Sequence, residues 1–173
     1  WTQTPQLSVV KLTDVARYEF EVFSDEALGI PEVTGISLTN TFSVPQAEKL
    51  AFGKYWWRAR VYDKAGNESA WTAARVFEVT MHKTPLNGLY TTNPVQPFAW
   101  YAMPGATGYE IQVCSDANCD DTPVRLFSRP VSTTYTPAAG EAFADGVYYW
   151  RMRYNSVSGW SDWTLPYKFT KIH

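Results

Sequence analysis

With 173 residues, a net charge of -2 and 18% charged residues, the chain has no basic surface for nucleic acid and no polybasic patch for a membrane. No apolar run approaches the roughly 18 residues that a transmembrane helix requires, so we expect no membrane insertion. The aromatic content of 16% is typical of a β-rich protein. Because the chain opens on Trp1 rather than Met and shows no signal peptide, we expect a mature fragment or an excised piece.

The first part of the chain predicts short strands separated by turns. Alternating apolar and polar residues, bounded by Gly, Pro and Asp, are typical of an antiparallel sheet. The turn at 63–67 has suitable polar and Gly chemistry, and a long variable loop with Gly29, Pro31 and Gly35 precedes position 37. The expected strands are residues 6–10, 17–24, 37–44 (a pair of edge strands), 55–62 and 74–80.

The second part of the chain repeats the first. Gly53 lines up with Gly146 at an offset of 93, Trp71 lines up with Trp163 at 92, and residues further upstream match at 91. Offsets that drift so little indicate two copies of one fold with small loop insertions. The expected strands of the second copy are residues 97–101, 109–115, 124–128, 133–136, 147–155 and 166–172.

These repeats predict an all-β chain of two tandem domains, at 1–81 and 85–173, joined by a linker at 82–84 that Pro85 makes semi-rigid. Each domain is expected to be a seven-stranded immunoglobulin-like antiparallel sandwich. Residues 85–93 have no counterpart ahead of residue 6, so we expect the first domain to lack its first strand. Truncation explains this better than a strand donated by a neighbouring chain, because natural proteins usually cover open sheet edges.

The strand at 147–155 indicates where the core lies. In an extended strand, Tyr148, Trp150, Met152 and Tyr154 share one face, and four large apolar side chains on one side predict a buried face. The arginines between them face outward.

Three features are similar to a known family. Trp100 on the second strand, Tyr148 at the start of the sixth and the segment 159–164 resemble a fibronectin type III domain. More narrowly, the stretches 105–116, 146–153 and 159–163 resemble the tandem modules of bacterial secreted and cell-surface proteins. The resemblance implies the fold for the whole chain but little about function, since such modules serve as spacers, adhesins, receptors and enzyme appendages.

The segment 160–164 is similar to the Trp-Ser-x-Trp-Ser motif of cytokine receptors, with Thr164 in place of the last Ser. The first domain lacks the paired cysteines by which such receptors resemble one another, so we do not expect a receptor of that class. Outward-facing arginines two residues apart can hold an indole between their guanidinium planes. A stabilising ladder is favoured over a ligand-facing platform. The expected ladders are Arg58, Trp71 and Arg60 in the first copy and Arg151, Trp163 and Arg153 in the second.

Cys114 and Cys119 flank a polar loop, and this spacing predicts a disulfide that closes it. A pair of reduced thiols is the alternative, and no metal site is expected because further soft ligands are absent nearby. The disulfide favours an oxidising, extracellular or cell-surface location. Asp116, Asp120 and Asp121 crowd the same loop, where a solvated acidic loop is preferred to a calcium site.

Nothing in the sequence assembles an active site. His82, in the expected linker, and His173 lie near no plausible nucleophile, and no cofactor motif is present. Asn67 begins a formal glycosylation sequon. Four outward-facing side chains are expected to form cross-strand pairs with the arginines rather than a catalytic carboxylate pair: Glu19, Glu21, Glu110 and Gln112.

Tyr101, Tyr149 and Trp160 remain as aromatics that could face a ligand, and sugar rings could stack on them if they lay together. We therefore expect a non-enzymatic spacer or adhesion segment of a larger surface or secreted protein. Its partners would be other domains of that protein, and a surface protein or polysaccharide. The alternatives are a carbohydrate-binding or substrate-positioning appendage of a secreted hydrolase, and a subunit of an extracellular filament with a donated edge strand.

Overall fold

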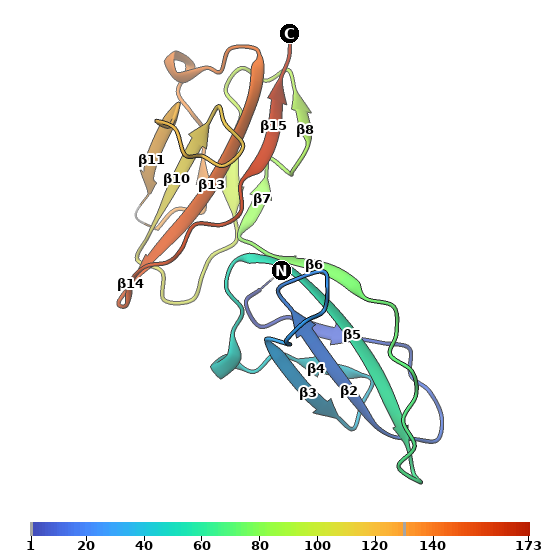
Figure 1. Ribbon diagram of the computed structural model, residues 1–173. Coiled ribbons are helices and arrows are strands. Elements are labelled where there is room, and N and C mark those ends of the chain that lie inside the picture. Colours follow the sequence, from blue (N-terminus) through green and yellow to red (C-terminus); the bar gives the residue numbers. More distant parts are fainter. Residues whose placement is uncertain (1, 130) are drawn as a thin grey trace. The chain divides into compact units, whose positions relative to one another are not determined.

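The computed structural model describes residues 2–129 and 131–173 and divides into two compact units, Trp1–Thr80 (unit 1) and Met81–His173 (unit 2). In Figure 1 unit 1 runs from blue to green and unit 2 from green to red. Both are β-sandwiches, which confirms the all-β class. Within the described ranges the helices are two short 3-10 turns, η1 Gln46–Glu48 and η2 Ala139–Glu141. Neither is long and apolar enough to cross a membrane.

Unit 1 packs a four-stranded sheet against a two-stranded sheet. The larger sheet has the order β3-β2-β5-β6, and the smaller one pairs β1 with β4. All of these pairings are antiparallel, and the long strands β2 and β5 lie side by side (Figure 1). The strands are β1 Gln6–Ser8, β2 Val15–Phe23, β3 Val33–Ser37, β4 Thr41–Ser43, β5 Gly53–Asp63 and β6 Arg75–Val79.

The core of unit 1 follows the two-residue alternation of β5. Tyr55, Trp57 and Ala59 are buried, whereas Arg58 and Arg60, at alternate positions, lie on the outer face of the sheet. Burying a large apolar side chain stabilises a fold by about 1.5–3 kcal/mol. The other buried residues of this core are Leu7, Tyr18, Phe20, Val22, Val33, Val44, Leu50, Phe77 and Val79.

Unit 2 repeats this plan with additional strands. One sheet has the order β11-β10-β13-β15-β8, with β14 attached to β13, and the other has the order β12-β9-β7. Only the pairing of β15 with β8 is parallel among the described strands. The strands are β7 His82–Thr84, β8 Leu89–Thr91, β9 Phe98–Trp100, β10 Gly108–Cys114, β11 Arg125–Arg129, β12 Thr134–Tyr135, β13 Gly146–Ser156, β14 Gly159–Trp160 and β15 Tyr167–Lys171.

The central strand pairs of the two units have the same register. Glu19 lies opposite Arg60 in unit 1, and Glu110 lies opposite Arg153 in unit 2. The sequence offsets of 91 and 93 are therefore those of structurally corresponding strands. As a result, the outer faces of the two larger sheets can be compared position by position.

The expected linker at 82–84 is instead strand β7, which pairs with β9. His82 lies opposite Trp100 and is only 4% exposed. Its ring stacks on Tyr167, with centroids 3.9 Å apart, and meets the Trp150 ring edge-on at 4.2 Å. Because this histidine is packed among aromatic side chains, unit 2 begins at Met81 rather than after a linker.

In its described residues, 81–129 and 131–173, unit 2 has nine strands rather than the seven expected. β8 lies within residues 85–93, where the sequence indicated the strand that the first domain lacks. The two strands without a prediction, β7 and β14, are three and two residues long, too short to show the alternation that identifies a strand. Neither β7 nor β8 has a counterpart in the described part of unit 1, where β1 pairs only with β4 and β6 pairs only with β5.

The variable loop expected before position 37 is also partly wrong, because Gly35 lies within β3. The ring of Phe42 lies so close that a Cβ at position 35 would be 2.0 Å from its Cε2. Glycine is therefore required by this packing and does not mark a loop. The edge-strand pair expected at 37–44 is accordingly β3, which ends at Ser37, and β4.

Candidate functional site

The outer face of the larger sheet in unit 1 carries a column of alternating cations and rings. Trp71 lies between Arg58 and Arg60, and each guanidinium carbon is 4.5 Å from a ring centre of the indole. Tyr62 extends the column beyond Arg60 at 5.2 Å, and Arg17 ends it at 4.0 Å from the Tyr62 ring. We call Arg58, Trp71, Arg60, Tyr62 and Arg17, in this order, ladder 1.

Carboxylates on neighbouring elements neutralise ladder 1. Glu21 accepts a hydrogen bond of 2.8 Å from Nε of Arg58, and Glu19 accepts one of 2.6 Å from Nε of Arg60. Glu68 forms a second ion pair with Arg60 at 2.6 Å. Burial acts to raise the pKa of Glu19, but hydrogen bonds from Arg60 and Tyr62 and the charges of Arg60 and Arg17 hold it below its ordinary value.

Unit 2 carries a shorter column. Trp163 lies between Arg151, at 5.0 Å, and Arg153, at 4.5 Å. Trp160 lies 4.8 Å from Arg153, and its strand partner Asn155 is two residues beyond that arginine on β13. We call Arg151, Trp163, Arg153 and Trp160 ladder 2. Trp160 therefore takes the place beside its arginine that Tyr62 takes in unit 1.

The two arginines of ladder 2 have different hydrogen-bond acceptors. Arg153 donates a hydrogen bond of 2.7 Å to Glu110. Arg151 donates to the neutral amide of Gln112 at 2.8 Å and to the carbonyls of Asn118 at 3.1 Å and Cys119 at 2.9 Å. Burial lowers the pKa of Arg151, against the opposing charges of Asp120 and Asp116. The expected cross-strand pairs are therefore ion pairs at Glu19, Glu21 and Glu110, and a hydrogen bond from a charged arginine to a neutral amide at Gln112.

Cys114 and Cys119 form the expected disulfide. The carboxylate of Asp116 accepts hydrogen bonds from the backbone N–H groups of Asn118, Asp120 and Asp121, at 3.1, 3.0 and 3.3 Å. These bonds, above all that from Asp120, lower its pKa. Asp116 thus closes the loop, and no cluster of candidate metal ligands is found among the described residues.

The corresponding loop of unit 1 has the same backbone shape without a disulfide. Leu28 stands where Cys119 stands, with φ of 56° and 58°, and Phe23 stands where Cys114 stands. Asp25 accepts a backbone hydrogen bond from Gly29, as Asp116 does from Asp120. The two loops therefore differ mainly in the disulfide, which closes the loop of unit 2 and is replaced by Phe23 and Leu28 in unit 1.

Side-chain hydroxyls bind the tryptophan-bearing segments to the long strands, a role that the sequence analysis missed. In unit 1, Ser69 and Thr72 accept hydrogen bonds of 3.1 Å from the backbone N–H groups of Val61 and Ala59. In unit 2, Ser161 and Thr164 likewise accept bonds of 3.1 Å from Tyr154 and Met152. The shared Ser-x-Trp-Thr spacing was the available signal.

The three aromatics expected to face a ligand do not come together. Tyr101 (57% exposed) follows β9 in the smaller sheet of unit 2, and Trp160 (46% exposed) lies on β14. Tyr149 is half-buried on β13, six residues before the strand partner of Trp160, which corresponds to about 20 Å along an extended strand. The separation is too large for one sugar ring to reach both Tyr149 and Trp160.

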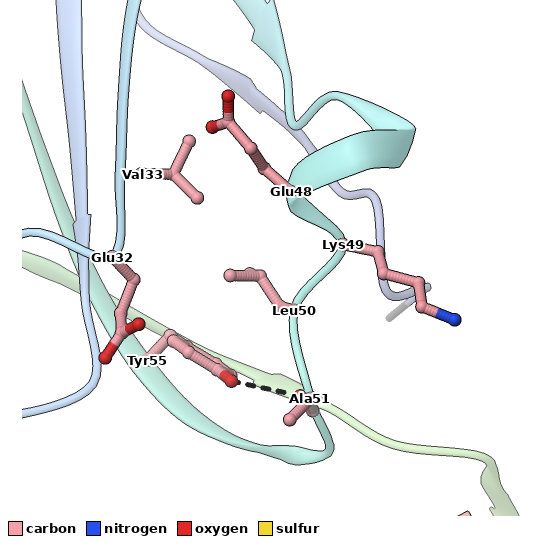
Figure 2. A pocket seen from close by; sticks show the side chains of 7 residues that line it. All are labelled: Glu32, Val33, Glu48, Lys49, Leu50, Ala51 and Tyr55. Atoms are coloured by element: carbon pink, nitrogen blue, oxygen red, sulfur yellow. Dashed lines mark hydrogen bonds between the residues drawn. The ribbon is translucent and has the colours of Figure 1, made fainter.

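Unit 1 also contains a hollow of about 460 Å³. Figure 2 shows the side chains that line it, with the hydroxyl of Tyr55 directed to the carbonyl of Ala51 at 3.1 Å. Burial, followed by the charge of Glu32, raises the pKa of this tyrosine. Tyr148 donates the equivalent hydrogen bond to the carbonyl of Ala144 in unit 2, so we assign Tyr55 a structural role. The lining residues are Glu32, Val33, Glu48, Lys49, Leu50, Ala51 and Tyr55.

The histidines do not form a catalytic group with each other. His82 has its Nε2 atom 3.2 Å from the carbonyl oxygen of Trp150, and burial lowers its pKa to about 3. His173 is exposed at the end of the chain beside Asp145. His82 is therefore a neutral core residue at ordinary pH.

No protein-family model matches the chain, and no curated protein matches it. Among solved structures, the chain is similar to the crystal structure of chicken CNTN1 FN1-FN3 domains, with 7% sequence identity and a TM-score of 0.40. The match covers 99% of this chain and 63% of that one, so this chain spans less than two thirds of the solved protein. The assignment of a β-sandwich fold rests on the strand order of the two units.

Proposed function

We propose that the chain is a non-catalytic extracellular module that acts as a spacer or adhesion segment of a larger secreted or surface protein. The observation that carries this proposal is the ladder present in both units. Charged and aromatic side chains that could otherwise contact a ligand are bonded to one another, and each cation-π contact contributes about 0.5–1 kcal/mol at an exposed site. Such a surface stiffens the sheet that bears it.

The disulfide supports the extracellular part of the proposal, because disulfides persist mainly in oxidising compartments. The partners that we propose are other domains of the parent protein, and a surface protein. No cofactor, nucleic acid or membrane insertion forms part of the proposal.

Mechanical unfolding of the intact chain tests the spacer role. We expect two separate unfolding events, distinguished by the different lengths of Trp1–Thr80 and Met81–His173. Trp71→Ala should lower the force of the first unit alone, and Trp163→Ala that of the second alone. Unchanged unfolding forces in both variants would refute a mechanical role for the ladders.

A carbohydrate-binding appendage is the second candidate, supported by the exposed ring of Trp160. A glycan array probed with the intact protein, Trp160→Ala and Tyr149→Ala separates the two. We expect no specific glycan, because Tyr149 and the strand partner of Trp160 lie six residues apart on β13, about 20 Å of extended strand. A glycan whose binding is lost in either variant would replace the spacer proposal.

A filament subunit with a donated strand is the third candidate. It is supported by the edge of β1, which pairs only with β4 in the described residues, whereas the corresponding β9 pairs on both sides. Sedimentation over a wide concentration range tests it. A spacer stays monomeric, while strand donation produces oligomers that grow with concentration.

A further inference from the structure

Ladder 2 ends one member earlier than ladder 1. In unit 1 the Tyr62 ring is approached by two guanidinium groups, Arg60 at 5.2 Å and Arg17 at 4.0 Å. In unit 2 the Trp160 ring is approached by Arg153 at 4.8 Å, and no second cation contacts it among the described residues. The two columns therefore match up to this ring and differ beyond it.

The sequence explains the difference through one residue. Arg17 lies opposite Tyr62 on the neighbouring strand, and the position corresponding to Arg17 in unit 2 is Gly108. Gly108 lies opposite Asn155, which in turn lies opposite Trp160 on its other side. Because glycine has no side chain, this position supplies no cation to the end of ladder 2.

The Trp160 ring is suited to receive a cation from outside. Its side chain is 46% exposed, and the preceding hairpin turn carries Val157, which is 98% exposed. The charge of Arg153 beneath the ring is met by Glu110, through a hydrogen bond of 2.7 Å. An incoming cation would therefore meet the electron-rich ring face and not an uncompensated positive charge.

We propose that Trp160 is a docking point for an arginine or lysine side chain of a protein partner, which completes ladder 2 as Arg17 completes ladder 1. The inference rests on the proposed interaction role and names the chemistry of the partner, a basic segment. A cation is favoured over a sugar ring because the same position in unit 1 is occupied by a guanidinium group of the chain itself.

The test is an NMR titration of the intact protein that follows the indole N–H signals. The probe is a five-residue peptide with two arginines, and the control is the same peptide with citrulline, a neutral isostere of arginine. We expect the arginine peptide to shift the Trp160 signal saturably, and citrulline to leave it unchanged. Added salt should weaken the binding, because an exposed charge is screened.

Two reciprocal variants make the test specific. Gly108→Arg supplies the missing cation within the chain and should weaken peptide binding at Trp160 about fivefold or more. Arg17→Gly opens the equivalent place in unit 1 and should create peptide binding near Tyr62. Trp160→Ala should lose the binding while both units stay folded, with a smaller loss of stability than Trp163→Ala causes.

Three outcomes would overturn the proposal: an equal response to citrulline, peptide binding unaffected by Gly108→Arg, or a Trp160 shift with neutral oligosaccharides but not with the arginine peptide. The mechanical test is independent of all three. If the intact protein does not bind the arginine peptide but its unfolding forces depend on Trp71 and Trp163, the cation site alone is rejected. If the peptide binds but the unfolding forces are unchanged in Trp71→Ala and Trp163→Ala, the stiffening role alone is rejected.

Discussion

Gln112 in unit 2 occupies the position of Glu21 in unit 1, and each accepts a hydrogen bond of 2.8 Å from the Nε atom of a ladder arginine. The same geometry is thus built once with a carboxylate and once with a neutral amide. In unit 2, Arg151 is satisfied in addition by two carbonyls of the disulfide loop. The two units therefore satisfy corresponding guanidinium groups with different acceptors, a carboxylate in unit 1 and neutral oxygens in unit 2.

Exchanging glutamate and glutamine at this position should change the free energy of unfolding of the two units by different amounts. Glu21→Gln should lower the free energy of unfolding of unit 1 by about 0.5–1 kcal/mol, because Arg58 loses its ion-pair partner. Gln112→Glu should change unit 2 by less than about 0.5 kcal/mol, because Asp116 and Asp120 already act on Arg151. Urea denaturation measures both, and equal effects would contradict the difference in neutralisation.

Removing the central indole should destabilise each unit strongly. Trp71→Ala and Trp163→Ala each remove two cation-π contacts and a half-buried ring, and we expect a loss of about 2–3 kcal/mol. Thermal melts of single variants are the measurement. Trp160→Ala is the control: it removes one contact of a more exposed ring, so a loss as large as that of Trp163→Ala would argue against the ladder as the cause.

The hydroxyl group of Thr164 should contribute more to the stability of unit 2 than the packing of its side chain does. Thr164 is 2% exposed and accepts a hydrogen bond from the N–H group of Met152. Thr164→Val keeps the shape but leaves this donor unpaired, which should cost about 1–3 kcal/mol. Thr72→Val removes the same bond to Ala59 in unit 1 and should act in the same direction. Faster hydrogen exchange at the Met152 amide would locate the effect, and slow exchange would contradict it.

Unit 2 should lose stability as the pH falls below neutrality. Burial lowers the pKa of His82 from 6.5 to about 3, so the neutral form stabilises the fold fully above the unfolded value and less as the pH drops towards 3. Between pH 7 and pH 5 the loss should be about 2 kcal/mol. Chemical denaturation at several pH values measures it.

A variant isolates this histidine from the acidic groups. His82→Phe keeps an aromatic ring beside Tyr167 but cannot take up a proton. The pKa values of Asp116 and Glu141 are lowered from 3.8 and 4.5, so their contributions are lost only at lower pH than this window. An unchanged pH dependence in His82→Phe would show that another group causes the loss.

Opening the disulfide should loosen one end of ladder 2. Replacing both Cys114 and Cys119 by Ser should lower the stability of unit 2 by about 2–3 kcal/mol, as for other short disulfide loops. The loop that supplies two carbonyls to Arg151 is then held less firmly. The indole signal of Trp163 should broaden, while that of Trp71 serves as an internal reference. A sharp, unshifted Trp163 signal would argue against the coupling.

Much of the fold could be predicted because the repeat preserves register. The match of Gly53 to Gly146 places the arginines of both long strands on one face and the rings of the core on the other. The positions of Trp71 and Trp163 followed from the two-residue spacing of those arginines. Local alternation and spacing suffice where a long strand carries the pattern.

The remaining features depend on contacts between distant segments. His82 looked like a linker residue because its aromatic neighbours, Trp150 and Tyr167, are far away in sequence. Gly35 looked like a loop residue because the ring of Phe42 that excludes a side chain lies seven residues on. The open end of ladder 2 became visible only when Gly108 was placed opposite Asn155. Periodicity carries no information on such pairs.

The shared backbone of the two loops after β2 and β10 makes them exchangeable parts. Leu28 and Cys119 have the same left-handed conformation, and each loop is closed by an aspartate at the corresponding place. A graft of one loop onto the other unit would leave the strand register intact, because both ends join at equivalent positions. The loop after β10 carries both the disulfide and the two carbonyls that accept hydrogen bonds from Arg151. A single graft would therefore transfer both features to unit 1.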